Sequence, residues 1–311
     1  MNLKAGDDVK TELSKPNGKL SCGRERPKPV SFEFKTQAQI IHMEIKKFQT
    51  LIWNYYKKHK RPLPWRKNIN PYRILVSEIM LQQTQVSRVM PKYRLFLKLF
   101  PNVQLLAAAS LSDVLAAWSG LGYYRRAKFL HTAAKKIVSD FKGKIPGRAA
   151  GLRTLPGIGP NTAGAIAAYA YNQPEVFIET NIRKIYLHYF FADREDVYDS
   201  ELLPIIESTL DKKNPREWYW ALMDYGVFLS SQVENPNRRS RHYITQSKFE
   251  GSLRQLRAKI LKLIVNYKKI SLTEIKKLVQ DERVETALRQ LLEERFIFKK
   301  RNVYSIHSDA M

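Results

Sequence analysis

A glycine-rich stretch with the composition of a phosphate-binding hairpin lies near the middle of this 311-residue chain. It is LPGIGPNT, from Leu155, and the alanine-rich segment AGAIAAYAY follows at once. Gly157 and Gly159 can adopt positive φ and place no side chain between backbone and ligand. The hairpin can therefore direct backbone N–H groups at a phosphate beside the start of the next helix. Such a grip holds a nucleic-acid backbone without distinguishing bases. The same glycines can also serve only to turn one helix into the next.

Two acidic residues lie where a carboxylate could act in catalysis. Glu78 occurs in SEIMLQQTQ, and if residues 76–89 form one helix, Glu78 shares a face with Gln82 opposite an apolar face. Glu179 occurs in VFIETNIR, where the chain leaves an apolar run and enters a helix. Taken alone, Glu78 is more commonly an exposed or ion-paired helix carboxylate, and Glu179 can simply cap its helix.

A further stretch, WSGLGYYRR from Trp118, combines a glycine turn with aromatic rings and guanidinium groups. Aromatic rings stack on bases or wedge between them, while arginines such as Arg125 and Arg126 neutralise phosphates. The structural alternative buries one tyrosine in the core and leaves both arginines in solvent.

The elements that carry these stretches are predicted to be helices. Apolar residues spaced by three and four begin at about Ala38 and recur to about Leu229, and Pro or Gly clusters separate helix-length pieces. No run alternates between hairpin turns as strands do. We therefore predict an all-α domain over residues 38–231. Residues 1–37 lack an apolar period and are expected to form a basic flexible arm.

A connector and a small second unit are predicted beyond the helical domain. Residues 232–252 are basic and poor in large aliphatics, which indicates a connector on the surface or on a ligand. Residues 253–311 show three helical segments and then a strand pair, the order of a winged-helix unit, and Ser271 with Glu274 fits a capping box. The helices and strands are expected at 253–265, 271–279, 283–295, 296–299 and 303–306.

Composition limits the classes of partner. Lys plus Arg is 54 and Asp plus Glu is 29, a net charge of +25, which indicates nucleic acid as the first candidate partner and an acidic membrane as the second, and charge alone does not choose between them. The charged regions also lack a long amphipathic helix with aromatic anchors. Cys22 is the single cysteine, which excludes a disulfide framework or a metal site of several thiolates. No apolar segment is long enough to cross a bilayer, so we expect a soluble intracellular protein.

These stretches, with LPWR, PYRILVSEIMLQQTQV and ALMDYG, resemble in their order the helix-hairpin-helix DNA glycosylases over roughly residues 40–229. Among these they are most similar to the adenine-excising, MutY-type branch. The resemblance implies a monofunctional enzyme of base excision repair that hydrolyses the N-glycosidic bond of an everted base. Adenine opposite guanine or 8-oxoguanine is the expected base. The expected partner is double-stranded DNA with a mismatched or damaged pair, bound by a monomer in the cytoplasm at the nucleoid and not at a membrane.

The resemblance also assigns roles to residues. Glu78 matches the acid that protonates the purine leaving group and helps to activate water, and Glu179 matches the carboxylate that faces the sugar cation. Asn161 and Asn181 complete the expected catalytic set. The expected DNA contacts are Gln83 and Tyr123 as wedges, Gly157 and Gly159 in the hairpin, and Arg125 and Arg126; Trp65, Arg66 and Gln82 are expected to border the base pocket.

Two departures from the family pattern concern the reaction. The family ordinarily carries Asp where this chain has Glu179. The added methylene lengthens the reach by about 1.5 Å, whereas catalytic groups need placement within about 0.5 Å. The backbone must therefore retreat or the chemistry must differ. Asn161 stands where adenine glycosylases carry Ser or Tyr and strand-cleaving relatives carry Lys. Without an amine there, Schiff-base strand scission is not expected and the product is an abasic site.

Two further departures concern cofactor and specificity. Most relatives follow this domain with four cysteines that hold an iron–sulfur cluster, but residues 230–252 contain none. A cluster is thus excluded by ligand count, no metal or other cofactor is expected, and the basic connector is expected to contact phosphates instead. The usual domain that recognises 8-oxoguanine is replaced by the predicted winged helix.

These departures keep two alternatives open. One is a mismatch thymine or uracil glycosylase of the same fold. The other is a non-catalytic DNA-binding protein on a glycosylase scaffold, which only a turnover measurement separates from the enzyme.

Overall fold

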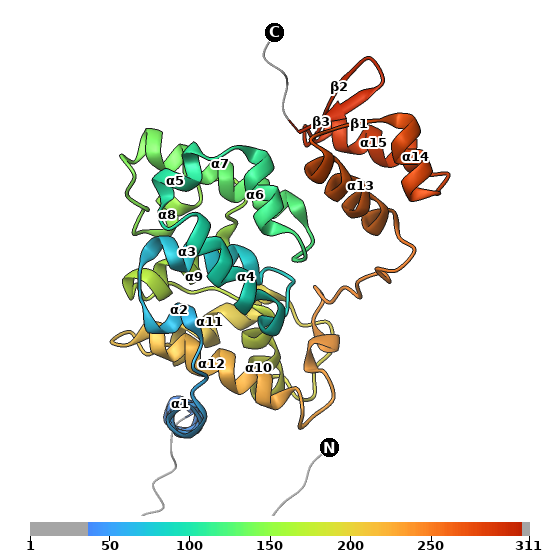
Figure 1. The fold of residues 1–311 in the computed structure, drawn as a ribbon. Coiled ribbons are helices and arrows are strands. Elements are labelled where there is room, and N and C mark those ends of the chain that lie inside the picture. The colour runs from blue at the N-terminus through green and yellow to red at the C-terminus, as the bar shows by residue number, and fades with distance from the viewer. Residues whose placement is uncertain (1–36, 307–311) are drawn as a thin grey trace, which may run out of the picture. The chain divides into compact units, whose positions relative to one another are not determined.

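The computed structural model describes residues 37–306, with side chains from Glu44 onward, and is helical over most of this range (Figure 1). The arm predicted over residues 1–37 therefore lies outside the described residues except for Gln37. The helices before the connector are α1 (Gln37–His59), α2 (Pro64–Lys67), α3 (Pro71–Leu81), α4 (Val86–Leu99), α5 (Val103–Ala108), α6 (Leu111–Trp118), α7 (Tyr124–Asp140), α8 (Ala149–Leu152), α9 (Pro160–Tyr171), α10 (Thr180–Phe190), α11 (Asp199–Thr209) and α12 (Pro215–Leu229). The prediction of an all-α domain is confirmed.

Helix α3 joins two groups of helices. It packs against α4 on one side and α9 on the other, so that α4 to α7 form one group and α9 to α12 the second (Figure 1). Aromatic packing fixes α1 to the second group. The ring of Phe48 lies 5.4 Å from Tyr186 in α10 and 6.2 Å from Trp218 in α12, centroid to centroid. Ile52 and Tyr56 follow at helical spacing and are buried on the same side.

The prediction of one helix over residues 76–89 is wrong, because the chain turns between α3 and α4. Gln82 ends α3 with a ψ of 112°, and Gln83 adopts a φ of +55°. The guanidinium of Arg126, from α7, occupies the break and donates hydrogen bonds to the carbonyl oxygens of Ile79 (3.0 Å) and Met80 (2.8 Å). These are carbonyls that a helix C-terminus leaves without intrahelical partners. The break turns residues 82–85 away from the axis of α3.

The C-terminal unit contains the predicted helices and hairpin. Ser271 caps the second helix, since its Oγ accepts from the Glu274 N–H (3.2 Å) while the Glu274 carboxylate accepts from the Ser271 N–H (2.8 Å). A third strand was not predicted, because three residues between two helices show no alternation. The elements are α13 (Leu253–Tyr267), β1 (Lys269–Ser271), α14 (Leu272–Val279), α15 (Val284–Glu293), β2 (Phe298–Lys300) and β3 (Val303–Ser305).

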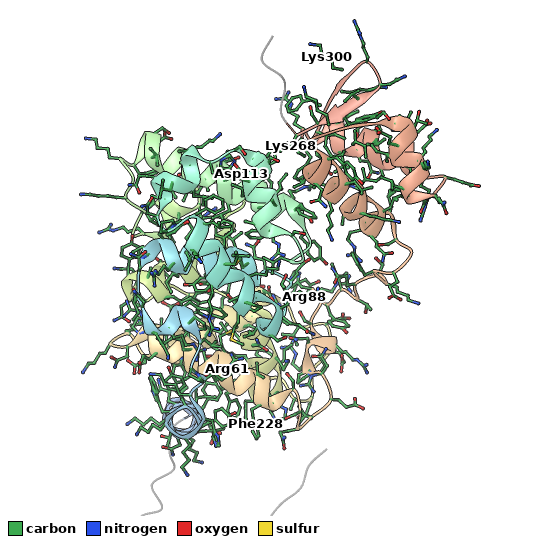
Figure 2. All side chains as sticks on the ribbon, in the orientation of Figure 1. Arg61, Arg88, Asp113, Phe228, Lys268 and Lys300 are labelled. Carbon is green, nitrogen blue, oxygen red and sulfur yellow. The ribbon has the colours of Figure 1, made fainter. Side chains whose placement is uncertain are left out.

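The sheet is antiparallel, with strand order β1-β3-β2. Ile270 pairs with Tyr304 and both are buried, which closes the small core of the unit. Lys300 projects at the tip of the β2–β3 hairpin (Figure 2). The winged-helix assignment of this unit stays a prediction.

The connector packs more closely on the helical domain than predicted. Its first part forms the 3-10 turn η1 (Pro236–Arg239), and the buried Asn237 side chain donates to the carbonyl oxygen of Thr180 (3.3 Å). The guanidinium of Arg239 donates to the carbonyl oxygens of Leu187 (3.0 Å) and Ala192 (2.9 Å). Arg239 therefore caps the end of α10 and does not face a ligand. From Arg241 to Glu250 the connector is exposed.

Candidate active site

A cavity of about 1290 Å³ lies where the end of α3, the start of α9 and the segment before α10 meet. It collects every predicted site residue except Gly159. The lining includes Trp65, Arg66, Glu78, Gln82, Gln83, Tyr123, Arg125, Arg126, Gly157, Asn161, Glu179 and Asn181. Residues from five separate stretches of the sequence thus come together at one cavity.

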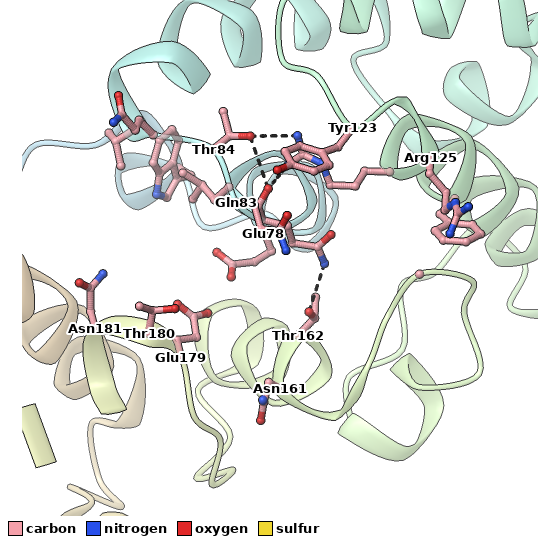
Figure 3. A pocket seen from close by; sticks show the side chains of 18 of the residues that line it. Glu78, Gln83, Thr84, Tyr123, Arg125, Asn161, Thr162, Glu179, Thr180 and Asn181 are labelled. Carbon is pink, nitrogen blue, oxygen red and sulfur yellow. Dashed lines mark hydrogen bonds between the residues drawn. The ribbon is translucent and has the colours of Figure 1, made fainter. Parts of the chain in front are cut away.

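Glu78 and Glu179 face each other across this cavity from opposite walls (Figure 3). Asn70 fixes the helix that carries Glu78, because its side chain accepts from the N–H groups of Tyr72 and Arg73 at the start of α3. Glu179 is the residue that precedes α10, and its side chain makes no capping hydrogen bond. The interpretation of Glu179 as a simple helix cap is therefore wrong.

The surroundings of the two carboxyls favour their protonated forms. Burial raises the pKa of Glu78 well above its usual value; the negative charge of Glu179 raises it further, and Arg66 partly offsets this. Burial raises the pKa of Glu179 to about 7. Neither carboxyl forms an ion pair within residues 44–306. Burial and the neighbouring carboxylate both act on Glu78, so a proton on the pair is favoured on Glu78.

A buried ionic cluster fixes Arg66 in the cavity wall. Its guanidinium donates two hydrogen bonds to Asp224, of 2.7 and 3.0 Å, and Arg61 donates to the same carboxylate through Nε at 2.5 Å. The Arg66 guanidinium also lies 5.3 Å from the ring centroid of Trp220, which stacks on Tyr169. The sequence analysis missed Asp224, although a carboxylate inside the apolar stretch ALMDYG could have drawn attention to it.

Asn161 holds the backbone beside Glu179. Its Oδ1 accepts a hydrogen bond from the N–H of Ile178 (3.2 Å), and its side chain points away from Glu78 (Figure 3). Gln82, which was predicted to border the base pocket, donates to the hydroxyl of Thr162 (3.2 Å). Thr162 belongs to the LPGIGPNT stretch, and it was also missed.

Asn181 is held by two neighbours that the sequence analysis did not identify. Lys184 is buried and donates to Oδ1 of Asn181 (3.3 Å) and to the carbonyl oxygen of Gly226 (3.3 Å). A Cβ at Gly226 would lie 2.9 Å from the backbone oxygen of Asn181. Only glycine allows α12 to approach the start of α10 this closely.

The two predicted wedge residues share an uncommon backbone conformation. Gln83 has a φ of +55° and Tyr123 a φ of +47°, in the left-handed region that residues with side chains rarely occupy. Strain of this kind collects at functional sites. The hydroxyl of Tyr123 is hydrogen-bonded to Gln246 of the connector and lies 3.4 Å from Nη1 of Arg254 in α13.

The two arginines of the GLGYYRR stretch have different surroundings. Arg126 is buried, and its guanidinium is used on the carbonyl groups at the end of α3, so it does not present a charge to a phosphate as predicted. Arg125 is exposed, and its Nη2 lies 2.7 Å from the carboxylate of Glu294 in α15. The structural alternative, which left both arginines in solvent, is therefore wrong for Arg126.

The glycine hairpin joins α8 to α9. Gly157 adopts a φ of +79°, and a Cβ there would lie 2.6 Å from Cβ of Phe129, so this position requires glycine. Gly159 has a φ of −81°, and the expectation of positive φ is wrong for this residue. It caps the start of α9, and a Cβ there would meet nothing within 4 Å. That side of the hairpin is open to a ligand.

The residues present do not fit an iron–sulfur cluster. Such a cluster is held by four Cys thiolates, and the whole sequence contains Cys22 alone. Across residues 37–306, no group of three or more His, Cys, Asp or Glu residues is arranged to hold a metal ion. Within the same range, no helix combines the length and apolar character of a bilayer-spanning segment.

Comparison with known sequences shows what the central part of the chain is similar to. Residues 76–203 match the HhH-GPD superfamily base excision DNA repair proteins. The chain is 38% identical over 183 residues to an adenine DNA glycosylase of Buchnera aphidicola subsp. Baizongia pistaciae. The matched region covers 58% of this chain and 52% of that protein. It is 32% identical over 236 residues to an adenine DNA glycosylase of Rattus norvegicus, and the matched region covers 70% of this chain and 45% of that protein. The chain thus spans about half the length of the curated relatives it matches.

Solved structures share the fold at lower identity. A thermostable thymine-DNA glycosylase superimposes with a TM-score of 0.56 at 20% identity, covering 63% of this chain and 91% of that one. An endonuclease III–DNA complex gives a TM-score of 0.50 at 15% identity, covering 58% and 84%. The glycosylase fold is therefore common to all three.

Proposed function

We propose that this chain, whose residues 76–203 form a domain of the HhH-GPD superfamily, is a monofunctional DNA glycosylase that removes adenine from a mispair with guanine or 8-oxoguanine. The observation that carries the proposal is the pair Glu78 and Glu179, which face each other across one cavity without ion-pair partners. Cleavage of a glycosidic bond needs one proton donor and one fixed negative charge, and this pair supplies both.

The reaction follows from the protonation states of the two carboxyls. Glu78 donates its proton to the departing base, and the electrons of the C1′–N bond leave with that base. The sugar becomes positive at C1′, where the carboxylate of Glu179 stabilises it. A water molecule then adds to C1′ and gives its proton to Glu78, which restores the starting state. No cofactor enters these steps.

The base must first rotate out of the DNA duplex, and its unstacking and unpairing cost a few kcal/mol. Gln83 and Tyr123 border the cavity in left-handed conformations and are suited to fill the space that the base vacates. The hairpin at Gly157 and Gly159 can hold the phosphate backbone at the start of α9. Asn161 acts through the backbone in this proposal, because its bond to Ile178 sets the position of the longer Glu179 side chain.

The absence of strand cleavage is also part of the proposal. Scission through a Schiff base needs an amine at the sugar. Within residues 44–306 no lysine lines the cavity, and Lys184, the buried lysine one turn beyond Asn181, donates to three oxygens of the protein. The expected product is an abasic site in an unbroken strand.

The test is a panel of duplexes with every mismatch, together with 8-oxoguanine, uracil and hydroxymethyluracil, in which abasic sites are detected by alkali. We expect cleavage after alkali for adenine opposite guanine or 8-oxoguanine and none before it. Glu78→Gln should slow base release by about a thousandfold, because general acid catalysis contributes about that much. Release of thymine or uracil alone would identify the mismatch glycosylase. No release from any duplex would leave a DNA-binding protein on this fold.

A further inference from the structure

A second cavity, of about 840 Å³, lies between α4 and α13. Its lining includes Gly120 and Gly122 from the turn before α7, the end of the connector and the loop after α14. Tyr124 and Ala258 line both this cavity and the catalytic one, so the two adjoin. We call the second cavity the α4–α13 groove.

The groove is strongly cationic. Its lining contains five cations, Arg88, Lys92, Lys259, Lys262 and Arg283, and one carboxylate, Asp281. The Asp281 carboxylate accepts hydrogen bonds from Nη2 (2.7 Å) and Nε (2.9 Å) of Arg283. These contacts and the nearby Lys259 lower the pKa of Asp281.

Three of these cations have no carboxylate partner in residues 44–306: Arg88 and Lys92 on α4, and Lys262 on α13. Arg88 projects from the start of α4 (Figure 2). Like charges on two facing walls repel each other unless an anion lies between them. The groove thus has the charge of a polyanion site, with cations on both walls.

Lys92 ties the groove to the turn that carries the wedge. Its Cε lies 3.3 Å from the position that a Cβ would take at Gly120, so the lysine lies over this turn. Tyr123 is three residues further on, which is at most about 11 Å of extended chain. Successive phosphates of one strand are about 3.4 Å apart along the helix axis. A strand opened at Tyr123 would therefore pass the groove within about three phosphates.

We infer that the α4–α13 groove binds the phosphodiester backbone of the DNA strand next to the opened base pair. The glycosylase domain holds this strand through Arg88 and Lys92, and the C-terminal unit holds it through Lys262. This inference rests on the proposed function and deepens it, since it assigns the C-terminal unit to the same DNA.

The test measures the salt dependence of binding to a duplex that cannot be cleaved. The full chain is titrated against a fluorescent duplex with a tetrahydrofuran abasic analogue opposite guanine, at a series of KCl concentrations. Each phosphate contact contributes about 0.9 to the slope of log Kd against log salt. Arg88→Ala, Lys92→Ala and Lys262→Ala should each lower the slope by about that amount, and the triple variant by about 2.7.

Matched controls remove the same charge elsewhere. Lys46→Ala, Lys57→Ala and Lys58→Ala replace exposed lysines of α1 that line neither cavity, and they should leave the slope unchanged. Thermal unfolding followed by circular dichroism should be the same for wild type and all variants, so that a lost contact is not confused with lost folding.

The outcomes separate this inference from the proposed function. An unchanged slope in the triple variant, or an equal fall in the α1 controls, overturns the inference. A fall for the α4 variants without one for Lys262→Ala overturns the assignment of the C-terminal unit. Because the duplex carries no base to release, a wild type without glycosylase activity contradicts the proposed function but leaves the groove result standing.

Discussion

The carboxylates on the two sides of the catalytic cavity differ in their ion pairing and in the direction of their pKa shifts. On the catalytic side, Glu78 and Glu179 have no ion-pair partners and raised pKa values. Asp224 in the wall binds two arginines, and Glu294, where the C-terminal unit borders the cavity, lies 2.7 Å from both Arg125 and Arg257. Burial raises the pKa of Glu294, but its contacts with Arg257 and Arg125 outweigh burial and hold that pKa below its usual value.

This difference indicates that the fold keeps the carboxyls of Glu78 and Glu179 apart from cations. The chain carries 54 Lys and Arg residues, so partners are plentiful, and Arg66 itself lines the same cavity as Glu78. Asp224 engages Arg66 through both terminal nitrogens and prevents it from pairing with Glu78. Perturbed carboxyls in a cavity are a physical signature of catalysis, whereas satisfied ones indicate structure.

The largest expected effect breaks the catalytic side of this comparison. Glu179→Gln removes the charge that faces the sugar cation and should slow single-turnover base release by about a thousandfold. Glu179→Asp should lose less, because it keeps the charge and shortens the reach by about 1.5 Å. Full activity of Glu179→Gln would contradict the role of this carboxylate.

The pH profile of the wild type belongs to the same prediction. Glu179 must be ionised, so base release should rise with pH up to about 7, where its pKa lies. At higher pH the rate should fall as Glu78 loses its proton, since its pKa is raised but finite. Glu179→Gln should lose the rising limb, and its falling limb should move to lower pH because the charge that helps to raise the pKa of Glu78 is gone. A rising limb that persists in this variant would assign it to another group.

A somewhat smaller effect is expected on the structural side. Asp224→Asn leaves Arg61 and Arg66 without a buried anion, and should lower the free energy of unfolding by about 3 kcal/mol. The matched control is Asp199→Asn, because Asp199 also binds an arginine, Arg183, but is partly exposed. Its loss should be about 1 kcal/mol or less. Urea unfolding at pH 7 measures both, and equal losses would show that burial of Asp224 adds nothing.

Sequence reasoning reached the helical domain and the members of the cavity, but not their contacts. Motif residues such as Glu78 and Glu179 could be found because their types and neighbours carry the chemistry. The role of Arg126 could not be assigned from the sequence, because a guanidinium can bind a DNA phosphate or the carbonyl groups at a helix end. Only the fold shows which of these groups lies beside it. The left-handed φ of Tyr123 leaves no signal either, since that conformation is ordinarily marked by glycine or asparagine.

Asp224 shows the same limit over a longer range. Its partners Arg61 and Arg66 precede it by 163 and 158 positions, so their ion pairs depend on how the fold brings residues 61–66 to α12. Local periodicity predicts that each helix exists but not which side chains meet.

The smallest expected effect concerns Glu294. It decides whether the ion pairs of Glu294 with Arg125 and Arg257 resemble the buried pairs of Asp224 or ordinary surface ion pairs. The Glu294 and Arg257 side chains are 21% and 25% exposed and Arg125 is 60% exposed, so water screens the contacts. Glu294→Gln should therefore lower the free energy of unfolding at pH 7 by about 1 kcal/mol or less. Because the folded pKa of Glu294 lies below its usual value, this contribution is present at neutral pH and is lost as pH falls through that pKa. Wild type and Glu294→Gln should then unfold alike in strong acid. A loss at pH 7 as large as that of Asp224→Asn would place Glu294 with the buried structural carboxylates instead.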